Sequence, residues 1–315
     1  MVRMLIKKIK HSIYIALICL GFWANAQAKV VVFACEPEWA ALAQEIGGDL
    51  LSVTTATHAK QDPHHIEARP SLIAQARKAD LVVGTGAELE DGWLPMILQK
   101  ANNPKILKNQ PGYLMMADFV TLKKHPQLKS TANHIDRSQG DVHAAGNPHI
   151  QLDPRLYLVF SKVLAERLSQ IDPQKKAVYQ TNYVQFNKKW EAKLRHWAQL
   201  AEPLKNMKIV VYHDNWVYLN DWLGLNQVTT LEPKPGVPPS AAYLKTVLST
   251  IMQTGGVKAI LHTPFEPVDA VNWLNQKTSI RVIALPFTVG GNTESKELAG
   301  FFDNIMQQLL LGIKT

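Results

Sequence analysis

Short, continuous apolar runs alternate along most of this chain with longer segments whose apolar residues recur every three or four positions. Such runs are typical of strands buried on both faces, and the wider spacing is typical of helices with one apolar face. The predicted strands are residues 29–34, 51–55, 81–84, 208–212, 228–231, 259–262 and 282–285. The predicted helices are residues 39–46, 70–77, 91–101, 216–222, 241–254, 268–276 and 296–311. Strands that alternate with helices indicate parallel βαβ units, so the fold class is α/β.

A long helical region separates the two groups of strands. It begins at Asp153-Pro154, breaks near Asp172-Pro173 and ends at about Ala201. Its second part has about 25 residues, which as one helix would span roughly 37 Å. The sequence therefore predicts two α/β lobes with parallel-sheet cores, joined by a long rigid helix. The expected domains are residues 29–153, 154–206 and 207–315, with a polar, histidine-containing mobile loop at 122–146 inside the first lobe.

The first 28 residues have the pattern of a secretory signal peptide. Four basic residues precede an apolar stretch at 13–22, and Ala26-Gln27-Ala28 is a small-x-small cleavage site. The apolar stretch is shorter than the roughly 20 residues that a transmembrane helix needs. We therefore expect the mature chain to begin at Lys29 and to be exported to the periplasm.

Removal of the signal peptide changes the net charge of the chain and the number of its cysteines. The whole chain has a net charge of +8, but residues 1–28 contain four basic and no acidic side chains, which leaves +4 on the mature chain. A mildly basic chain without a cluster of Lys and Arg gives no support for nucleic-acid binding. Only Cys35 remains after cleavage, so an intramolecular disulfide is excluded and Cys35 is expected to be buried and inert.

Three widely spaced histidines carry the candidate chemistry. His64 follows Asp62-Pro63, His149 follows Asn147-Pro148, and His213 follows an apolar strand. Neutral imidazole suits a borderline-soft divalent ion such as zinc, and ligands in α/β proteins collect where strands end. Three histidines from two lobes and the seam between them would meet only in the cleft between the lobes, which is where we expect a metal site.

Several neighbouring residues are candidates for a supporting role. His65 is an alternative ligand to His64, and Glu67 is a candidate carboxylate behind that ligand. Asp214 follows His213 and is a candidate for orienting it, although an acidic residue in a first helical turn is common in any case. The remaining candidates follow strands: Glu38 follows the first strand and His262 ends a later one.

These motifs resemble those of the periplasmic solute-binding proteins of ABC importers that carry zinc or manganese, the cluster A-I metal-binding family. The resemblance covers nearly the whole mature chain. The motifs that carry it are Asp62-Pro63-His64 with Pro70-Ser71, Pro148-His149 with Leu152-Asp153-Pro154, and His213-Asp214. It implies that His64, His149 and His213 bind Zn²⁺ as cargo, and that an ABC membrane permease is the partner of a monomeric protein.

The chain departs from this family at the fourth ligand. Many members have an aspartate after the last strand, where this chain has Ala284-Leu285-Pro286-Phe287-Thr288. Water, Glu38, His262 or a histidine of the 122–146 loop (His125, His134 or His143) could fill that position.

Three alternative functions stay open. Manganese or ferrous iron could be the cargo, although a third histidine, where manganese-type members tend to have glutamate, favours zinc. A secreted zinc hydrolase would need an open coordination position and a general base. The chain has no HExxH motif, so we expect a transport protein and not an enzyme. An additional adhesin-like role is the third alternative.

Overall fold

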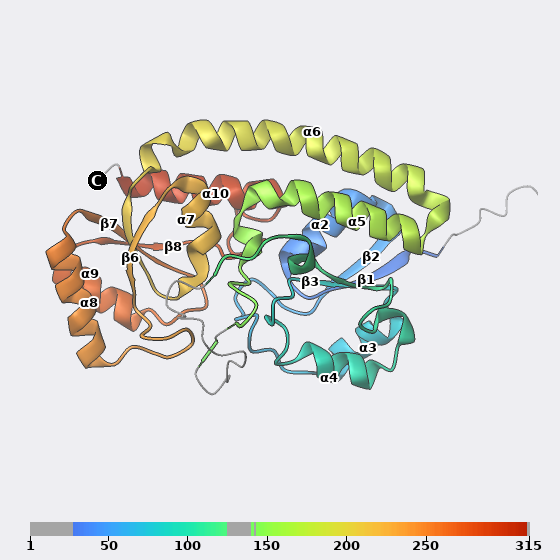
Figure 1. Cartoon of the computed structure of the whole chain (residues 1–315), viewed down its shortest axis with the longest axis horizontal. Coiled ribbons are helices and arrows are strands. Elements are labelled where there is room, and N and C mark those ends of the chain that lie inside the picture. The colour runs from blue at the N-terminus through green and yellow to red at the C-terminus, as the bar shows by residue number, and fades with distance from the viewer. Residues whose placement is uncertain (1–27, 125–139, 142, 314–315) are drawn as a thin grey trace, which may run out of the picture.

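The structure is a computed structural model that describes residues 28–124, 140–141 and 143–313. It contains two four-stranded parallel sheets, one in each of two lobes that lie side by side (Figure 1). The α/β prediction with two lobes is therefore confirmed. Among the described residues, no helix has the length and apolar character needed to cross a membrane. The predicted signal peptide and most of the polar loop lie outside the described residues.

The first lobe is built on a sheet with the strand order β2-β1-β3-β4. Its strands are β1 (Val30–Ala34), β2 (Leu51–Thr55), β3 (Leu81–Gly84) and β4 (Tyr113–Met115). Its helices are α2 (Pro37–Gly47), α3 (Pro70–Lys78) and α4 (Leu94–Ala101). Each of these helices begins with proline at one of its first two positions, where the missing N–H costs no hydrogen bond.

The second lobe repeats this topology, with the strand order β6-β5-β7-β8. Its strands are β5 (Lys208–Val211), β6 (Asn226–Thr230), β7 (Val257–His262) and β8 (Arg281–Ala284). Its helices are α7 (Val217–Leu223), α8 (Ala241–Thr254), α9 (Asp269–Thr278) and α10 (Leu298–Ile313). In both lobes the first strand lies between the second and the third, so the chain reverses direction along the sheet there, which in α/β sheets is where ligands bind.

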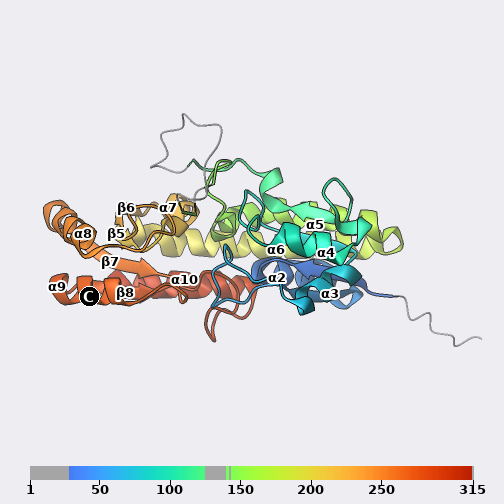
Figure 2. The ribbon, with the colours of Figure 1, turned by 90° about the horizontal axis from the view of Figure 1, so that it is seen from below.

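One long helix spans both lobes. Helix α5 (Tyr157–Ile171) is followed by α6 (Lys176–Ala201), which has 26 residues and arches over the whole molecule (Figure 1). In a view turned by 90°, α6 again runs along the long axis behind both lobes (Figure 2). Asn182 on α6 donates to the carbonyl of Ile46 in the first lobe, and Trp197 on α6 donates to Asp303 in the second lobe. The predicted connecting helix is therefore present and is hydrogen-bonded to each lobe.

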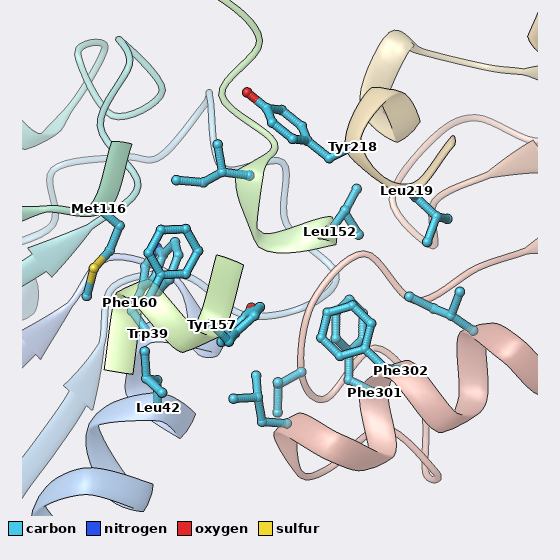
Figure 3. Packing of buried hydrophobic residues seen from close by; sticks show 14 of the residues in the cluster. Trp39, Leu42, Met116, Leu152, Tyr157, Phe160, Tyr218, Leu219, Phe301 and Phe302 are labelled. Carbon is cyan, nitrogen blue, oxygen red and sulfur yellow. The ribbon is translucent and has the colours of Figure 1, made fainter. Parts of the chain in front are cut away.

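A single apolar cluster continues from one lobe into the other beneath this helix. Trp39 on α2 stacks on Tyr157 of α5 with ring centroids 6.2 Å apart, and Tyr157 meets Phe302 of α10 at 5.7 Å. Figure 3 shows these three rings side by side in the seam between the lobes. Phe302 also contacts Trp197 of α6 at 5.3 Å. All four side chains are fully buried, so one apolar core continues through both lobes.

The sequence pattern missed strand β4 and misplaced some helix ends. Strand β4 has three residues and lies at the edge of its sheet, which is too short for a periodicity to appear. The helix predicted at 91–101 begins at Leu94. At Asp153-Pro154 a short 3₁₀ turn precedes α5, and Asp153 caps it by accepting from the N–H of Arg155. Cys35 is fully buried and forms no disulfide, as predicted.

The shared core leads to a prediction about stability. Replacing Phe302 by alanine should lower the free energy of unfolding by about 3–5 kcal/mol, because a large aromatic side chain leaves a cavity against rings of both lobes. Urea unfolding of the zinc-free protein, followed by tryptophan fluorescence and circular dichroism, measures this. The exposed Phe119 is the matched control, and its alanine variant should change stability by no more than about 0.5 kcal/mol. Two separate transitions in wild type would contradict a shared core.

Candidate metal centre

The three predicted histidines lie together between the lobes. The ring centroids of His64 and His149 are 5.6 Å apart, those of His64 and His213 are 6.0 Å apart, and those of His149 and His213 are 5.8 Å apart. His149 is 1 % exposed, and His213 and the side chain of His64 are below 10 %. Residues 85 and 64 positions apart in the sequence thus form one compact, largely buried cluster of imidazoles.

Each ring reaches this cluster from a different part of the fold. His64 lies in the loop after β2, and His213 lies two residues after β5, so both follow the carboxyl ends of parallel strands. His149 lies in the segment that joins the first lobe to α5, and its N–H donates to the side chain of Asn147. The amide of Asn147 donates to the carbonyl of Asp214 in the second lobe. Asn147 therefore fixes the middle histidine relative to the strand end that carries His213.

A fourth histidine lies beside His64. His143 is 7 % exposed, and its ring centroid lies 5.2 Å from that of His64. The Nε2 atoms of these two rings are 3.1 Å apart. The next residue, Ala144, donates its N–H to Glu88, which follows β3 in the first lobe. His143 is thus held with its ring beside that of His64.

The distances match those of imidazoles that share one tetrahedral ion. With zinc–nitrogen bonds of 2.0–2.1 Å, two nitrogen ligands of a tetrahedral site lie roughly 3.3 Å apart, and their ring centroids lie roughly 5 Å apart. The 3.1 Å between the two Nε2 atoms and the 5.2–6.0 Å between ring centroids are close to these values. To share such an ion, the rings of His64, His149 and His213 would have to draw together by up to about 1 Å.

A carboxylate stands behind two of the four rings. Asp62 accepts from Nδ1 of His64 at 2.7 Å, and Glu232 accepts from Nδ1 of His213 at 2.6 Å. A carboxylate on Nδ1 fixes the ring orientation and leaves Nε2 for the metal. The same arrangement is common in zinc proteins, where it also increases the basicity of the ligand.

These contacts shift the pKa values of the groups involved. Burial alone lowers the pKa of His213, but the hydrogen bond and charge of Glu232 outweigh burial and raise that pKa to about 9. Burial raises the pKa of Asp62, but the hydrogen bonds and charge of His64 outweigh it and lower that pKa to about 2. The contact with Glu232 therefore favours the protonated form of His213, and the contact with His64 favours the ionised form of Asp62.

Acidic groups of the second lobe surround His213 more widely than the sequence indicated. Asp214, the predicted orienting residue, accepts from Gln227, and its negative charge adds to the rise in the pKa of His213. The group that accepts a hydrogen bond from the ring of His213 is Glu232 instead. Glu232 follows β6, which lies beside β5 in the sheet. Residues that follow the carboxyl ends of neighbouring parallel strands lie close together, and this rule could have identified Glu232 as a neighbour of His213.

The other predicted neighbours lie in different surroundings. Glu38 accepts from the hydroxyl of Thr288, and burial raises its pKa to about 7. His262 pairs through Nδ1 with the carbonyl of Thr263. Glu67 is exposed and borders a cavity beside His64, and the ring of His65 is exposed and turned toward Asp141. As a fourth ligand, Glu38 and His262 are therefore placed less well than His143.

A second convergence of metal-ligating side chains is buried inside the first lobe. It consists of Cys35, Glu36 and Glu90, whose ligand atoms lie within 4.8 Å of one another. Burial raises the pKa of the Cys35 thiol and of the Glu36 carboxyl well above their usual values. Burial also raises the pKa of Glu90 to about 7, although backbone N–H groups of Thr85 and Gly86 donate to it. This cluster therefore favours bound protons.

Two similar lobes on a long helix, with buried imidazoles at the seam, define a metal-binding protein of the two-lobed, helix-joined class. The family model for the periplasmic component A of the zinc-uptake complex, ZnuA, matches residues 32–311. The chain therefore belongs to the ZnuA family.

Individual relatives agree with this assignment. The high-affinity zinc uptake system protein ZnuA of Yersinia pestis is 22 % identical over 98 % of both chains. A crystal structure of ZnuA superposes with a TM-score of 0.73 at 20 % identity, covering 90 % of this chain and 99 % of the other. A zinc-bound ZnuA lacking residues 138–173 of its own chain gives 0.72 at 22 % identity and covers 89 % and 96 %. The fold is also that of the manganese-bound FpvC of Pseudomonas aeruginosa, at a TM-score of 0.71, 20 % identity and coverage of 91 % and 99 %.

Glu232 should be important for metal affinity through its hydrogen bond with His213. Replacing it by glutamine removes the negative charge behind His213, and we expect zinc to bind about 10- to 100-fold more weakly. Competition with a chromophoric zinc chelator at fixed pH measures the change. Glu191→Gln, an exposed position on α6, is the matched control and should bind zinc like wild type. Equal affinities for Glu232→Gln and wild type would show that the contact has no role in binding.

The same contact predicts how affinity varies with pH. Zinc must displace a proton from His213, whose pKa is about 9, so affinity should keep rising with pH well above neutrality, by about tenfold per pH unit for each proton displaced. In Glu232→Gln the rise should level off nearer the ordinary histidine value of about 6.5. Chelator competition between pH 6 and pH 8.5 measures both profiles. A wild-type profile that is flat above pH 7 would contradict this prediction.

Proposed function

We propose that this protein is a high-affinity periplasmic zinc-binding protein that captures Zn²⁺ and delivers it to an ABC-type membrane permease. The observation that carries the proposal is the convergence of His64, His149 and His213 at the seam of a ZnuA-family fold. Membership of a periplasmic family and the signal-peptide pattern of residues 1–28 support the location.

We infer that His143 supplies the fourth ligand. Its Nε2 lies 3.1 Å from Nε2 of His64, in a position suited to a shared tetrahedral ion. This proposal accounts for the missing aspartate after the last strand. In that region Phe287 packs against the ring of His149 at 5.3 Å, and it closes the cluster with an apolar surface instead of a ligand.

The donor set favours zinc over manganese or ferrous iron. Four imidazoles suit zinc in tetrahedral geometry, whereas manganese prefers carboxylate and water oxygens in six-coordinate sites. The carboxylates nearest the cluster, Asp62 and Glu232, are directed at Nδ1 atoms of the histidines. They are therefore engaged in orienting ligands and balancing charge.

The same geometry weighs against a hydrolase. A catalytic zinc keeps an open position for water and needs a nearby general base. Four imidazoles around one ion would fill the tetrahedral shell, which suits capture and release of the ion better than catalysis. A separate expectation concerns movement. Because the two lobes share one core, we expect zinc binding to shift them only slightly relative to each other.

Zinc binding by the metal-stripped mature protein and single alanine variants tests this function. Wild type should bind one zinc tightly, and manganese should not displace it. Replacing His64, His149 or His213 should weaken that binding by more than about 100-fold, and replacing His143 by about 10- to 100-fold. His196→Ala, an exposed histidine on α6, is the control. Tight binding that survives all three main substitutions would overturn the proposed site and function.

A further inference from the structure

The buried group of Cys35, Glu36 and Glu90 lies where the first sheet reverses direction. Cys35 and Glu36 follow β1, and Glu90 lies in the segment that follows β3. Because β1 lies between β2 and β3, the segments that leave β1 and β3 run to opposite sides and open a crevice at the carboxyl ends of the strands. In sheets of this order the crevice between β1 and β3 is the usual ligand position. The group therefore occupies a ligand position inside the first lobe, separate from the histidines between the lobes.

Close packing around Gly84 brings the possible ligand atoms together. One ligand atom from each of the three side chains lies within 4.8 Å of the other two. A Cβ atom at Gly84 would lie 2.6 Å from Oε1 of Glu90 and 2.9 Å from Sγ of Cys35, so only glycine leaves room for both. A sulfur and an oxygen that share one tetrahedral zinc ion lie roughly 3.6 Å apart. Side-chain rotations that move these atoms by about 1 Å would therefore let one ion bind all three.

One carboxyl oxygen of this group has no hydrogen-bond donor. Glu36 is 3 % exposed, and its Oε2 accepts from the hydroxyl of Thr85 at 3.3 Å. No donor among the described residues reaches its Oε1, which is fully buried. A buried carboxyl oxygen without a donor is costly unless a proton or a cation satisfies it. Oε1 of Glu36 is therefore an independent sign that the group takes a positively charged partner.

The charges around the group also favour a cation. Three carboxyls raise the pKa of the Cys35 thiol in addition to its burial, those of Glu36, Glu90 and Glu38. Among the residues that the structure describes, no lysine or arginine forms an ion pair with any of these carboxyls. Without an ion the acids hold protons, and a divalent cation that replaces those protons balances two negative charges.

Acidic side chains extend from the surface to this group. A cavity of ≈ 310 Å³ is lined by Glu90 at its buried end and by the exposed Asp91 and Asp118. Carboxylates along a cavity raise the local concentration of cations. Glu90 therefore connects the buried group with a route by which an ion can enter.

We propose that Cys35, Glu36 and Glu90 form a buried site for one Zn²⁺ ion inside the first lobe. One thiolate and two carboxylates are ligands that zinc accepts. A bound ion ties the end of β1 to the segment after β3, and it binds more weakly than at the histidine cluster because buried acids must first release protons. The proposal uses no residue of the histidine cluster and is independent of the proposed zinc-capture function.

Cadmium titration of the metal-stripped mature protein tests the site. Cys35 is the only cysteine after residue 28, so an ultraviolet charge-transfer band from thiolate to cadmium can come only from this site. At about pH 8, wild type should develop this band and saturate it with one ion per chain. Cys35→Ser should abolish the band, and Glu36→Gln and Glu90→Gln should each weaken cadmium binding there by at least about tenfold. Glu191→Gln, on the exposed side of α6, is the control and should behave like wild type.

Zinc competition completes the test. Excess zinc should remove the band by displacing cadmium, and a band that zinc does not reduce would overturn a zinc site. The absence of a band in wild type that circular dichroism shows to be folded would overturn the site itself, whatever the variants do. Equal cadmium affinities in wild type, Glu36→Gln and Glu90→Gln would overturn the three-ligand assignment.

Failure of the zinc-capture function would appear separately. It would be seen as tight zinc binding that survives His64→Ala, His149→Ala and His213→Ala, whereas the band from Cys35 should be present in all three variants, because imidazoles contribute nothing to it.

Discussion

The apolar core shared by the two lobes is the constraint on which the metal centre depends. Rings from α2, α5, α6 and α10 pack against one another beneath the long helix, and this packing sets the distance between the two sheets. His64 and His213 are attached to opposite sheets, so their separation of 6.0 Å is a consequence of that packing. Because interiors this dense resist deformation, the packing keeps these histidines close together.

Two carboxylates behind the histidines balance the charge of a bound ion. A divalent ion among neutral imidazoles in a buried seam would carry an unbalanced charge of +2, which is costly away from water. Asp62 and Glu232, one from each lobe, contribute two negative charges directly behind two of the rings. Before zinc binds, His213 can take up a proton that balances Glu232. Zinc and protons therefore compete for the same charge-balanced position, which suits a protein that must both hold and release its cargo.

Much of the architecture could be predicted from the sequence. Seven of the eight described strands and the connecting helix follow from apolar periodicity, because buried parallel strands and one-sided helices leave different spacings. His64, His149 and His213 stood out because their motifs resemble those of a known family. The short edge strand β4 left no such trace, since its three residues show no period.

The sequence by itself determined the two α/β lobes, the long helix and the three principal histidines, since these depend on local pattern and short motifs. Only the tertiary structure placed His143 beside His64, and only it placed Glu232 behind His213, 19 residues away. It also brought Asp141 of the polar loop, whose N–H donates to Pro235 of the second lobe, close to His65. The physical reason is that these contacts join segments that are distant in the sequence, and their geometry is set by how the lobes pack.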